Sequence, residues 1–341
     1  MPRIVALDWD DQQLRLAIAQ QQAKELTLEA LVSLPLDTTV EAGSAPTDAI
    51  IRLIQQAVAD HRGRHADTIV AVRRAEVELR PLKLPPVPSE ELPEIVRFQA
   101  MREFSELAED WPIDFYPVED GGTEETTVLA AAINPTRLAE LQKVVEQSEL
   151  KLRNLVLRPC AAAVLVPHVP GQTEADVQLM VDDFGSAIEL TVLREQTAVF
   201  MRTVQPPTTE DPTGPGRVDY LAGEIRRTIL AVRNQLGGHP VHRIILFGAG
   251  PEHEEFCQGL QTRLHLDVQA IDPLQSFRLT RALTRQTPAG AGRFAATLGS
   301  LQEQAQQRRP AIDFLHPRRV APPKSHRNLL AAVGGGVGLV L

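Results

Sequence analysis

Apolar and polar residues alternate with two periods along this chain, and together the two periods predict a mixed α/β protein. Residues 3–8 form an apolar strand, and residues 14–19 and 26–34 extend it into an antiparallel meander. Residues 49–61 carry apolar side chains at the spacing of an amphipathic helix, and residues 68–72 form a strand that is apolar on both faces. The first part of the chain therefore predicts a sheet covered by helices.

The same order of elements recurs in the second half of the chain. Strands are expected over 177–181, 188–193 and 196–204, followed by a helix over 218–236 and an apolar strand over 243–247. Three strands, a helix and a fourth strand thus occur twice. This repetition predicts a duplicated, two-lobed α/β architecture with a cleft between the lobes.

Residues 75–133 interrupt the first of these units and predict a small inserted subdomain. A strand there ends in a cluster of prolines within 85–88, which forms a rigid connector. Ser89 is expected to cap a helix that runs to about Leu107, with acidic residues in its first turn. Two further strands complete the segment.

These patterns divide the chain into four parts. The first lobe, with its insertion, is expected over 1–165, and the second lobe over 175–305. A linker follows over 306–328, and the remainder, 329–341, is apolar. A length of 341 residues exceeds that of a usual single core, which agrees with more than one folded unit.

The last residues favour a membrane anchor. The stretch 329–341 is uncharged and follows several basic side chains, and a spanning helix needs about 20 apolar residues. We expect a truncated transmembrane helix, with residues 1–328 on the cytoplasmic side by the positive-inside rule. The alternative is a simple apolar tail, because the three consecutive glycines within this stretch are poor helix formers.

Composition narrows the function classes. The formal net charge is −9, and basic residues are scattered except near the C-terminus, so no nucleic-acid partner is expected. Cys160 and Cys257 lie far apart without metal-ligand spacing, which fits a reducing compartment and two buried small side chains. The nine histidines show no paired spacing that would indicate a metal site.

Five motifs occur in a fixed order along the chain: RPLKLPPVPSEELPEIVRFQA (80–100), VDDFG (181–185), GEIRRTI (223–229), LFGAG (246–250) and RFAATLGSL (293–301). Together they resemble the PilM and GspL group of the actin, sugar-kinase and heat-shock ATPase superfamily. The resemblance covers nearly the whole chain and is most specific in the proline-rich connector and helix of the insertion. It implies a two-lobed actin-like (ribonuclease H-like) fold with a nucleotide in the interlobe cleft.

The resemblance implies ATP and Mg²⁺ as cofactors, with Asp8 and Asp183 holding the metal through water. The first turn departs from the family pattern, because it has no glycine two positions after Asp8 and offers carboxylates instead. The second turn lacks the family's threonine pair, so the site is expected to be degenerate. The residues carried over for nucleotide binding are Asp8, Asp10, Arg15, Asp183, Gly185, Ser186, Glu224, Arg227, Gly248, Ala249 and Gly250.

Two other interpretations of these turns stay open. Asp8 and Asp183 are also the residue type that caps a turn at a strand end. The glycines of the turn at 248–250 are equally typical of an ordinary connection between a strand and a helix.

The segment IDFLHP (312–317) resembles the Ile-Asn-Leu-Leu-Pro peptide that begins PilN, the membrane partner of PilM. The resemblance implies a fused PilM and PilN arrangement, similar in plan to GspL and cut at its membrane helix. A peptide on the same chain would dock at a high effective concentration. The alternative is a basic linker that attracts anionic lipid. The implied partner-binding residues are Ile312, Asp313, Phe314, Leu315 and Pro317.

The leading hypothesis is a cytoplasmic scaffold or adaptor at the inner membrane. It would bind inner-membrane components of a type IV pilus or type II secretion-like assembly platform and would be anchored through its C-terminus. One alternative is an active, Mg-ATP-dependent ATPase or kinase of the same superfamily. Another is a filament-forming cytoskeletal protein.

Overall fold

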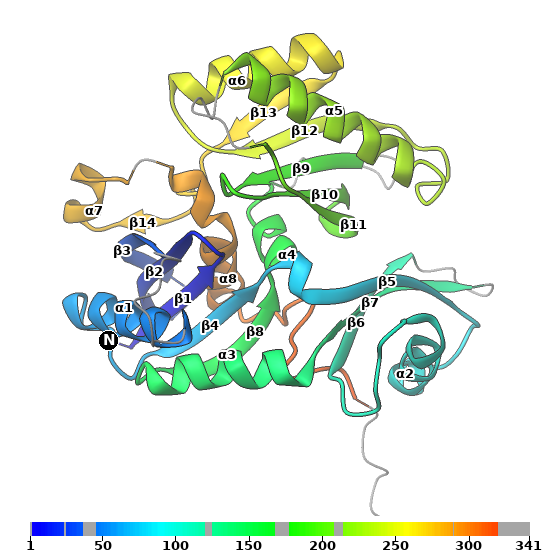
Figure 1. The fold of residues 1–341 in the computed structure, drawn as a ribbon, viewed down its shortest axis with the longest axis horizontal. Helices are drawn as coiled ribbons and strands as arrows, with labels where there is room; N and C mark the ends of the chain where they lie inside the picture. The colour runs from blue at the N-terminus through cyan, green and yellow to red at the C-terminus, as the bar shows by residue number, and fades with distance from the viewer. Residues whose placement is uncertain are drawn as a thin grey trace, which may run out of the picture.

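The chain folds around three β-sheets (Figure 1). The two larger sheets belong to the two lobes, and the smallest belongs to the insertion. The architecture is that of a computed structural model, which describes residues 2–23, 25–36, 46–119, 125–167, 177–207, 214–288 and 290–319.

The first lobe contains a six-stranded sheet in the order β14-β3-β2-β1-β4-β8. β1 runs antiparallel to β2 and parallel to β4, and its residues are apolar on both faces because helices cover both. The strands are β1 (Arg3–Trp9), β2 (Gln13–Gln22), β3 (Glu25–Pro35), β4 (Asp67–Val72), β8 (Lys151–Leu157) and β14 (Arg278–Leu279).

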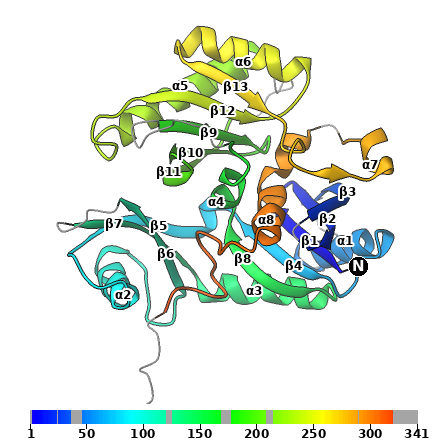
Figure 2. The same cartoon turned by 180° about the vertical axis from the view of Figure 1, so that it is seen from behind.

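Helices cover both faces of this sheet. α1 (Pro46–Asp60) and α3 (Pro135–Gln147) lie on one face, and α8 (Ala295–Ala305) lies on the other (Figures 1 and 2). α3 has Pro135 in its first turn, and the Asn134 side chain accepts a hydrogen bond from a backbone amide.

The second lobe contains a five-stranded sheet in the order β11-β10-β9-β12-β13. α5 (Pro215–Val232) and α6 (Pro251–Leu264) cover its outer face (Figure 1), while α4 (Arg158–Ala163) lies on the side of the first lobe. The strands are β9 (Val177–Asp183), β10 (Ile188–Arg194), β11 (Thr197–Val204), β12 (Val241–Phe247) and β13 (Asp267–Ile271).

The two sheets repeat one strand order. β3-β2-β1-β4-β8 in the first lobe corresponds to β11-β10-β9-β12-β13 in the second, with a helix before the fourth strand in each. The predicted duplicated, two-lobed α/β fold is confirmed.

The inserted subdomain is a three-stranded sheet in the order β5-β7-β6, with its own apolar core and one helix. Its elements are β5 (Val77–Leu84), α2 (Leu92–Glu103), β6 (Ile113–Glu119) and β7 (Thr126–Ile133), and the 3₁₀ turn η1 (Arg74–Glu76) leads into it. The predicted cap at Ser89 is wrong: α2 begins three residues later, with a proline in its first turn, and it ends at Glu103.

The end of the described chain returns to the first lobe. After α7 (Arg281–Arg285) and the 3₁₀ turn η2 (Ala291–Phe294), α8 packs so closely on α4 that a Cβ at Gly299 would lie 1.9 Å from the Ala161 carbonyl oxygen. No helix within the described residues is long and apolar enough to cross a bilayer. The stretch 329–341, predicted to begin a transmembrane helix, lies outside the described residues.

Candidate functional site: the interlobe turns and a docked segment

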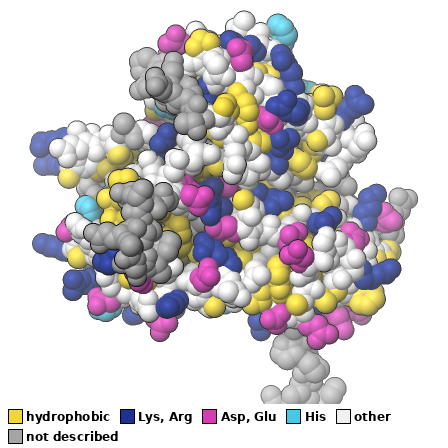
Figure 3. Space-filling model, in the orientation of Figure 1, with side chains coloured by type: hydrophobic (Ala, Val, Ile, Leu, Met, Phe, Trp, Pro, Cys, Tyr) yellow, Lys and Arg dark blue, Asp and Glu magenta, His cyan; other side chains and the backbone are white. Residues whose placement is uncertain are grey.

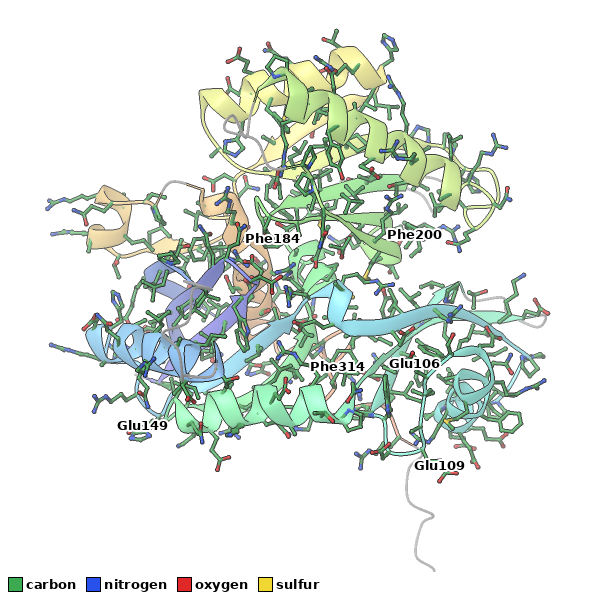
Figure 4. The ribbon with its side chains drawn as sticks, viewed as in Figure 1. Glu106, Glu109, Glu149, Phe184, Phe200 and Phe314 are labelled. Carbon is green, nitrogen blue, oxygen red and sulfur yellow. The ribbon has the colours of Figure 1, made fainter. Side chains whose placement is uncertain are left out.

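The turns predicted to hold a nucleotide meet between the lobes. β9 and β12 are parallel neighbours, with Val181 opposite Leu246, so the turns that follow them share one edge of the second sheet. The turn after β1 faces them, because the Arg15 guanidinium lies 4.8 Å from the centroid of the Phe184 ring. Figure 4 shows Phe184 in this position between the lobes.

In the first turn, Arg15 is buried and bound by two carboxylates. Its Nε donates to Asp8 at 2.6 Å and its Nη2 donates to Asp10 at 2.8 Å. Asp10 also accepts hydrogen bonds from the amides of Gln12 and Gln13, at 2.8 and 2.9 Å. Burial alone would raise the pKa of Asp10, but the Arg15 charge and these hydrogen bonds hold the pKa below its usual value.

The second turn has the same internal pairing. Arg217 on α5 donates to both oxygens of Asp183, at 2.6 and 2.8 Å, and the Gly185 amide donates to Asp183 at 2.8 Å. Gly185 has a φ of +88°, which favours glycine, and its Cα faces the Arg293 guanidinium. Ser186 is half-buried at the end of this turn.

A fully buried ion pair crosses between the lobes next to these turns. Arg158, at the start of α4, donates to the two oxygens of Glu189 on β10 at 3.1 and 2.7 Å. The Arg74 amide donates to the same carboxylate at 3.1 Å. Asp182 opposite Glu189 is buried, and burial together with the Glu189 charge raises the pKa of Asp182 well above its usual value.

The other residues predicted to bind the nucleotide belong to α5 and to the turn between β12 and α6 of the second lobe. Glu224 is paired with Arg202 and Arg227. A Cβ at Gly248 would lie 2.0 Å from the imidazole of His253, so this ring covers the turn. Ala249 and Gly250 are exposed, and Gly250 has a φ of +97°.

In the described structure, groups that would hold a magnesium triphosphate are paired with one another. Phosphate oxygens would need the turn amides, and hydrated Mg²⁺ would need the carboxylates. The Gln12 and Gly185 amides already donate to carboxylates of their own turns, and Asp8, Asp10 and Asp183 already face guanidinium groups. Across the described part of the chain, no group of three or more His, Cys, Asp or Glu residues is arranged to hold a metal.

A second candidate site is formed by residues 311–318, which dock on the first lobe after α8. The Phe314 amide donates to the Leu155 carbonyl oxygen at 2.9 Å, and the Leu155 amide donates to Asp313 Oδ1 at 3.1 Å. Asp313 pairs with Val156 as an antiparallel bridge, and Asn154 donates to Asp313 Oδ2 at 2.7 Å. The segment thus adds a short strand contact to the edge of β8.

Asp114 on β6 holds the other side of this segment. Its Oδ2 accepts the Asp313 amide at 2.9 Å, and its Oδ1 accepts the Arg318 amide at 2.9 Å and Arg318 Nη1 at 2.8 Å. The Arg318 guanidinium lies 5.6 Å from the centroid of the Phe115 ring. Because Asp114 is fully buried, its charge is compensated mainly by the docked segment.

Apolar side chains anchor the segment in the groove. Ile312 and Phe314 are fully buried in the core of the first lobe, and Figure 4 shows Phe314 between this lobe and the insertion. Leu315 and Pro317 are half-buried and line a cavity of about 560 Å³. The cavity is also lined by α2, α3 and the segment before β6, through Pro93, Val96, Trp111, Ile113, Leu138 and Gln142.

Five residues that organise these two sites were not predicted from the sequence: Asp114, Arg158, Phe184, Glu189 and Arg217. A signal was present for Glu189, because it is the one charged residue among the first six of an otherwise apolar strand. Such a charge needs a buried partner. The partner itself lies on the other lobe and could not be identified from spacing.

No protein-family model and no curated protein matches the sequence. Among solved structures, a chain of a PilM-PilN type IV pilus biogenesis complex is similar, with a TM-score of 0.72 and 20% identity over 89% of this chain and 98% of that chain. The cytoplasmic domain of EpsL, an inner-membrane component of the type II secretion system of Vibrio cholerae, has a TM-score of 0.50 and 10% identity, over 92% of this chain and 98% of that chain.

The chain has a PilM-like, actin-like fold. The predicted resemblance to PilM and to the secretion protein is therefore confirmed at the level of architecture. The PilM-like fold accounts for the two lobes and for the position of the turns between them.

Proposed function

We propose that this chain is a cytoplasmic scaffold of an inner-membrane assembly platform, of the type IV pilus or type II secretion kind. The observation that carries the proposal is the docking of residues 312–317 in the groove between β8 and β6. It is supported by the PilM-like fold and by a neighbour whose structure is a complex of PilM with PilN.

In this proposal the segment 312–317 acts as a PilN-like peptide that is part of the same chain. Ile312 and Phe314 supply buried apolar anchors, and Asp313 supplies the backbone-directed hydrogen bonds. A short connection between the end of α8 at Ala305 and the docked residues keeps the local concentration of the segment high.

Docking would also set where the chain leaves the scaffold. The last described residue, Arg319, lines the groove mouth beside α2. The stretch 329–341 would then continue to the inner membrane as a single-pass anchor, with the two lobes over 1–165 and 175–305 on its cytoplasmic side. Inner-membrane pilus or secretion components would be the partners.

The proposal is tested by complementing a deletion of the gene in the source bacterium. Leu315→Asp places a charge on a half-buried side chain of the docked segment and is expected to abolish surface pili or substrate secretion at normal protein level. Leu230→Asp, on an α5 position that is 67% exposed, is the matched control and should complement fully. Unchanged piliation and secretion in the deletion strain itself would refute the scaffold role.

The alternative, an active ATPase or kinase, makes a different prediction. The purified chain would then hydrolyse ATP in a Mg²⁺-dependent manner, and Asp183→Asn would abolish this activity. The pairing of Asp183 with Arg217 argues for the scaffold.

A further inference from the structure

The contact between the two lobes depends on groups that cross the interface. Glu189 on the second lobe accepts three hydrogen bonds from Arg158 and from the Arg74 amide, which follow β8 and β4 of the first lobe. Arg158 and Glu189 are each 1% exposed. A carboxylate and a guanidinium this deeply buried hold their positions strongly, since separating them leaves two uncompensated charges.

Phe184 makes a second crossing contact. The ring belongs to the turn after β9, and it lies between the guanidinium of Arg158 at 3.8 Å and that of Arg15 at 4.8 Å from its centroid. It is 2% exposed. Cations on an aromatic face attract it most strongly when water is excluded, which is the case here.

Beside these crossing contacts, other side chains take the positions at which a nucleotide would act. In each turn a carboxylate, Asp10 or Asp183, accepts the amides that a phosphate would need. A guanidinium, Arg15 or Arg217, faces that carboxylate where a metal cation would be required. The chain thus supplies both the anions and the cations of this region from its own side chains.

We propose that Arg15, Arg158, Phe184 and Glu189 form an internal latch that holds the lobes together without nucleotide. Beside the latch, residues predicted to bind a magnesium nucleotide are paired with arginines of their own lobes, so the interlobe contact is made by side chains of the chain itself. This inference goes beyond the scaffold role and does not depend on which assembly platform is served.

The first arm of the test uses the wild-type full chain. Amide hydrogen exchange is measured at Gln12, Gly185 and Arg74 with Mg²⁺ alone, with Mg-ATP and with Mg-ADP, alongside calorimetry of the same additions. We expect no binding heat and the same exchange rates in all three conditions. Saturable binding that slows exchange at Gln12 and Gly185 would overturn the proposal.

The second arm removes the latch. Phe184→Ala is expected to speed exchange of the Arg74 amide by about tenfold or more, because this amide bonds across the lobes. Phe256→Ala, in the core of the second lobe, is the control. In this variant the exchange rate of the Arg74 amide should change no more than the rates of other amides of the first lobe. If Phe184→Ala does not fold, Glu189→Gln replaces it. Unchanged Arg74 exchange in the folded latch variant refutes the latch.

Discussion

Replacing Asp114 by Asn tests the docking of the C-terminal segment with almost no change in shape. Both oxygens of Asp114 accept hydrogen bonds from the segment, one from the Asp313 amide and the other from the amide and guanidinium of Arg318. An asparagine offers one oxygen and one NH₂ group. Its NH₂ group must therefore face either the Asp313 amide or the two Arg318 donors, none of which can accept a hydrogen bond. The charge that Arg318 meets in the buried groove is also lost.

The magnitude follows from these contacts. One charge-assisted hydrogen bond contributes about 1.5–3 kcal/mol, and a buried donor left without an acceptor costs about 1–3 kcal/mol. We therefore expect D114N to lower the free energy of unfolding by about 3–5 kcal/mol if the segment unfolds with the lobe. If the segment detaches alone, the same loss appears as faster exchange of the Phe314 amide, which bonds to Leu155 across the groove.

The assay combines urea unfolding with hydrogen exchange at Phe314. Asp110→Asn is the matched control, because Asp110 is exposed beside the same groove and should change neither measurement. If D114N leaves the free energy of unfolding within about 0.5 kcal/mol of wild type and leaves Phe314 exchange unchanged, the assigned role of Asp114 is wrong.

Three further predictions concern stability. Burial raises the pKa of Glu303 from 4.5 to about 7, so the folded chain holds a proton that the unfolded chain lacks, and stability should fall as pH rises from about 4.5 to about 7. E303Q should abolish this pH dependence and raise the free energy of unfolding by up to about 3 kcal/mol at pH 8. A wild-type urea midpoint that stays the same from about pH 4.5 to about pH 7 would contradict the prediction. Phe314→Ala should lower the free energy of unfolding in urea by about 3–5 kcal/mol, because it leaves a cavity at a buried position. A decrease below about 1 kcal/mol would contradict the burial of Phe314. Gly299→Ala should lower the melting temperature by several degrees through its clash with the Ala161 carbonyl, and a wild-type melting temperature would be inconsistent with this packing.

The sequence could predict the fold because its signals are local and repeated. The apolar strands and the helix before each fourth strand depend on neighbouring residues, and they recur in both halves. The start of α2 was misplaced because Ser89 has the chemistry of a cap, whereas the helix begins only at Leu92, beside a proline.

The two sites could be predicted only in part. Asp8, Asp10 and Asp183 are recognisable from their turns, but their pairing with arginines depends on side chains placed by the fold. Arg217 meets Asp183 across 34 positions, and Asp114 meets Arg318 across 204 positions. Contacts of this separation leave no periodic signal in a single sequence.

The position of α8 has a consequence for biosynthesis. Ala295, Leu298 and Leu301 are fully buried in the core of the first lobe, and Figure 2 shows α8 in front of the first-lobe sheet, on the face opposite α1 and α3. A ribosome must therefore release nearly the whole globular chain before the sheet made first can be covered. The N-terminal strands therefore keep one apolar face uncovered until α8 has been made, so the core of this lobe is completed late in synthesis.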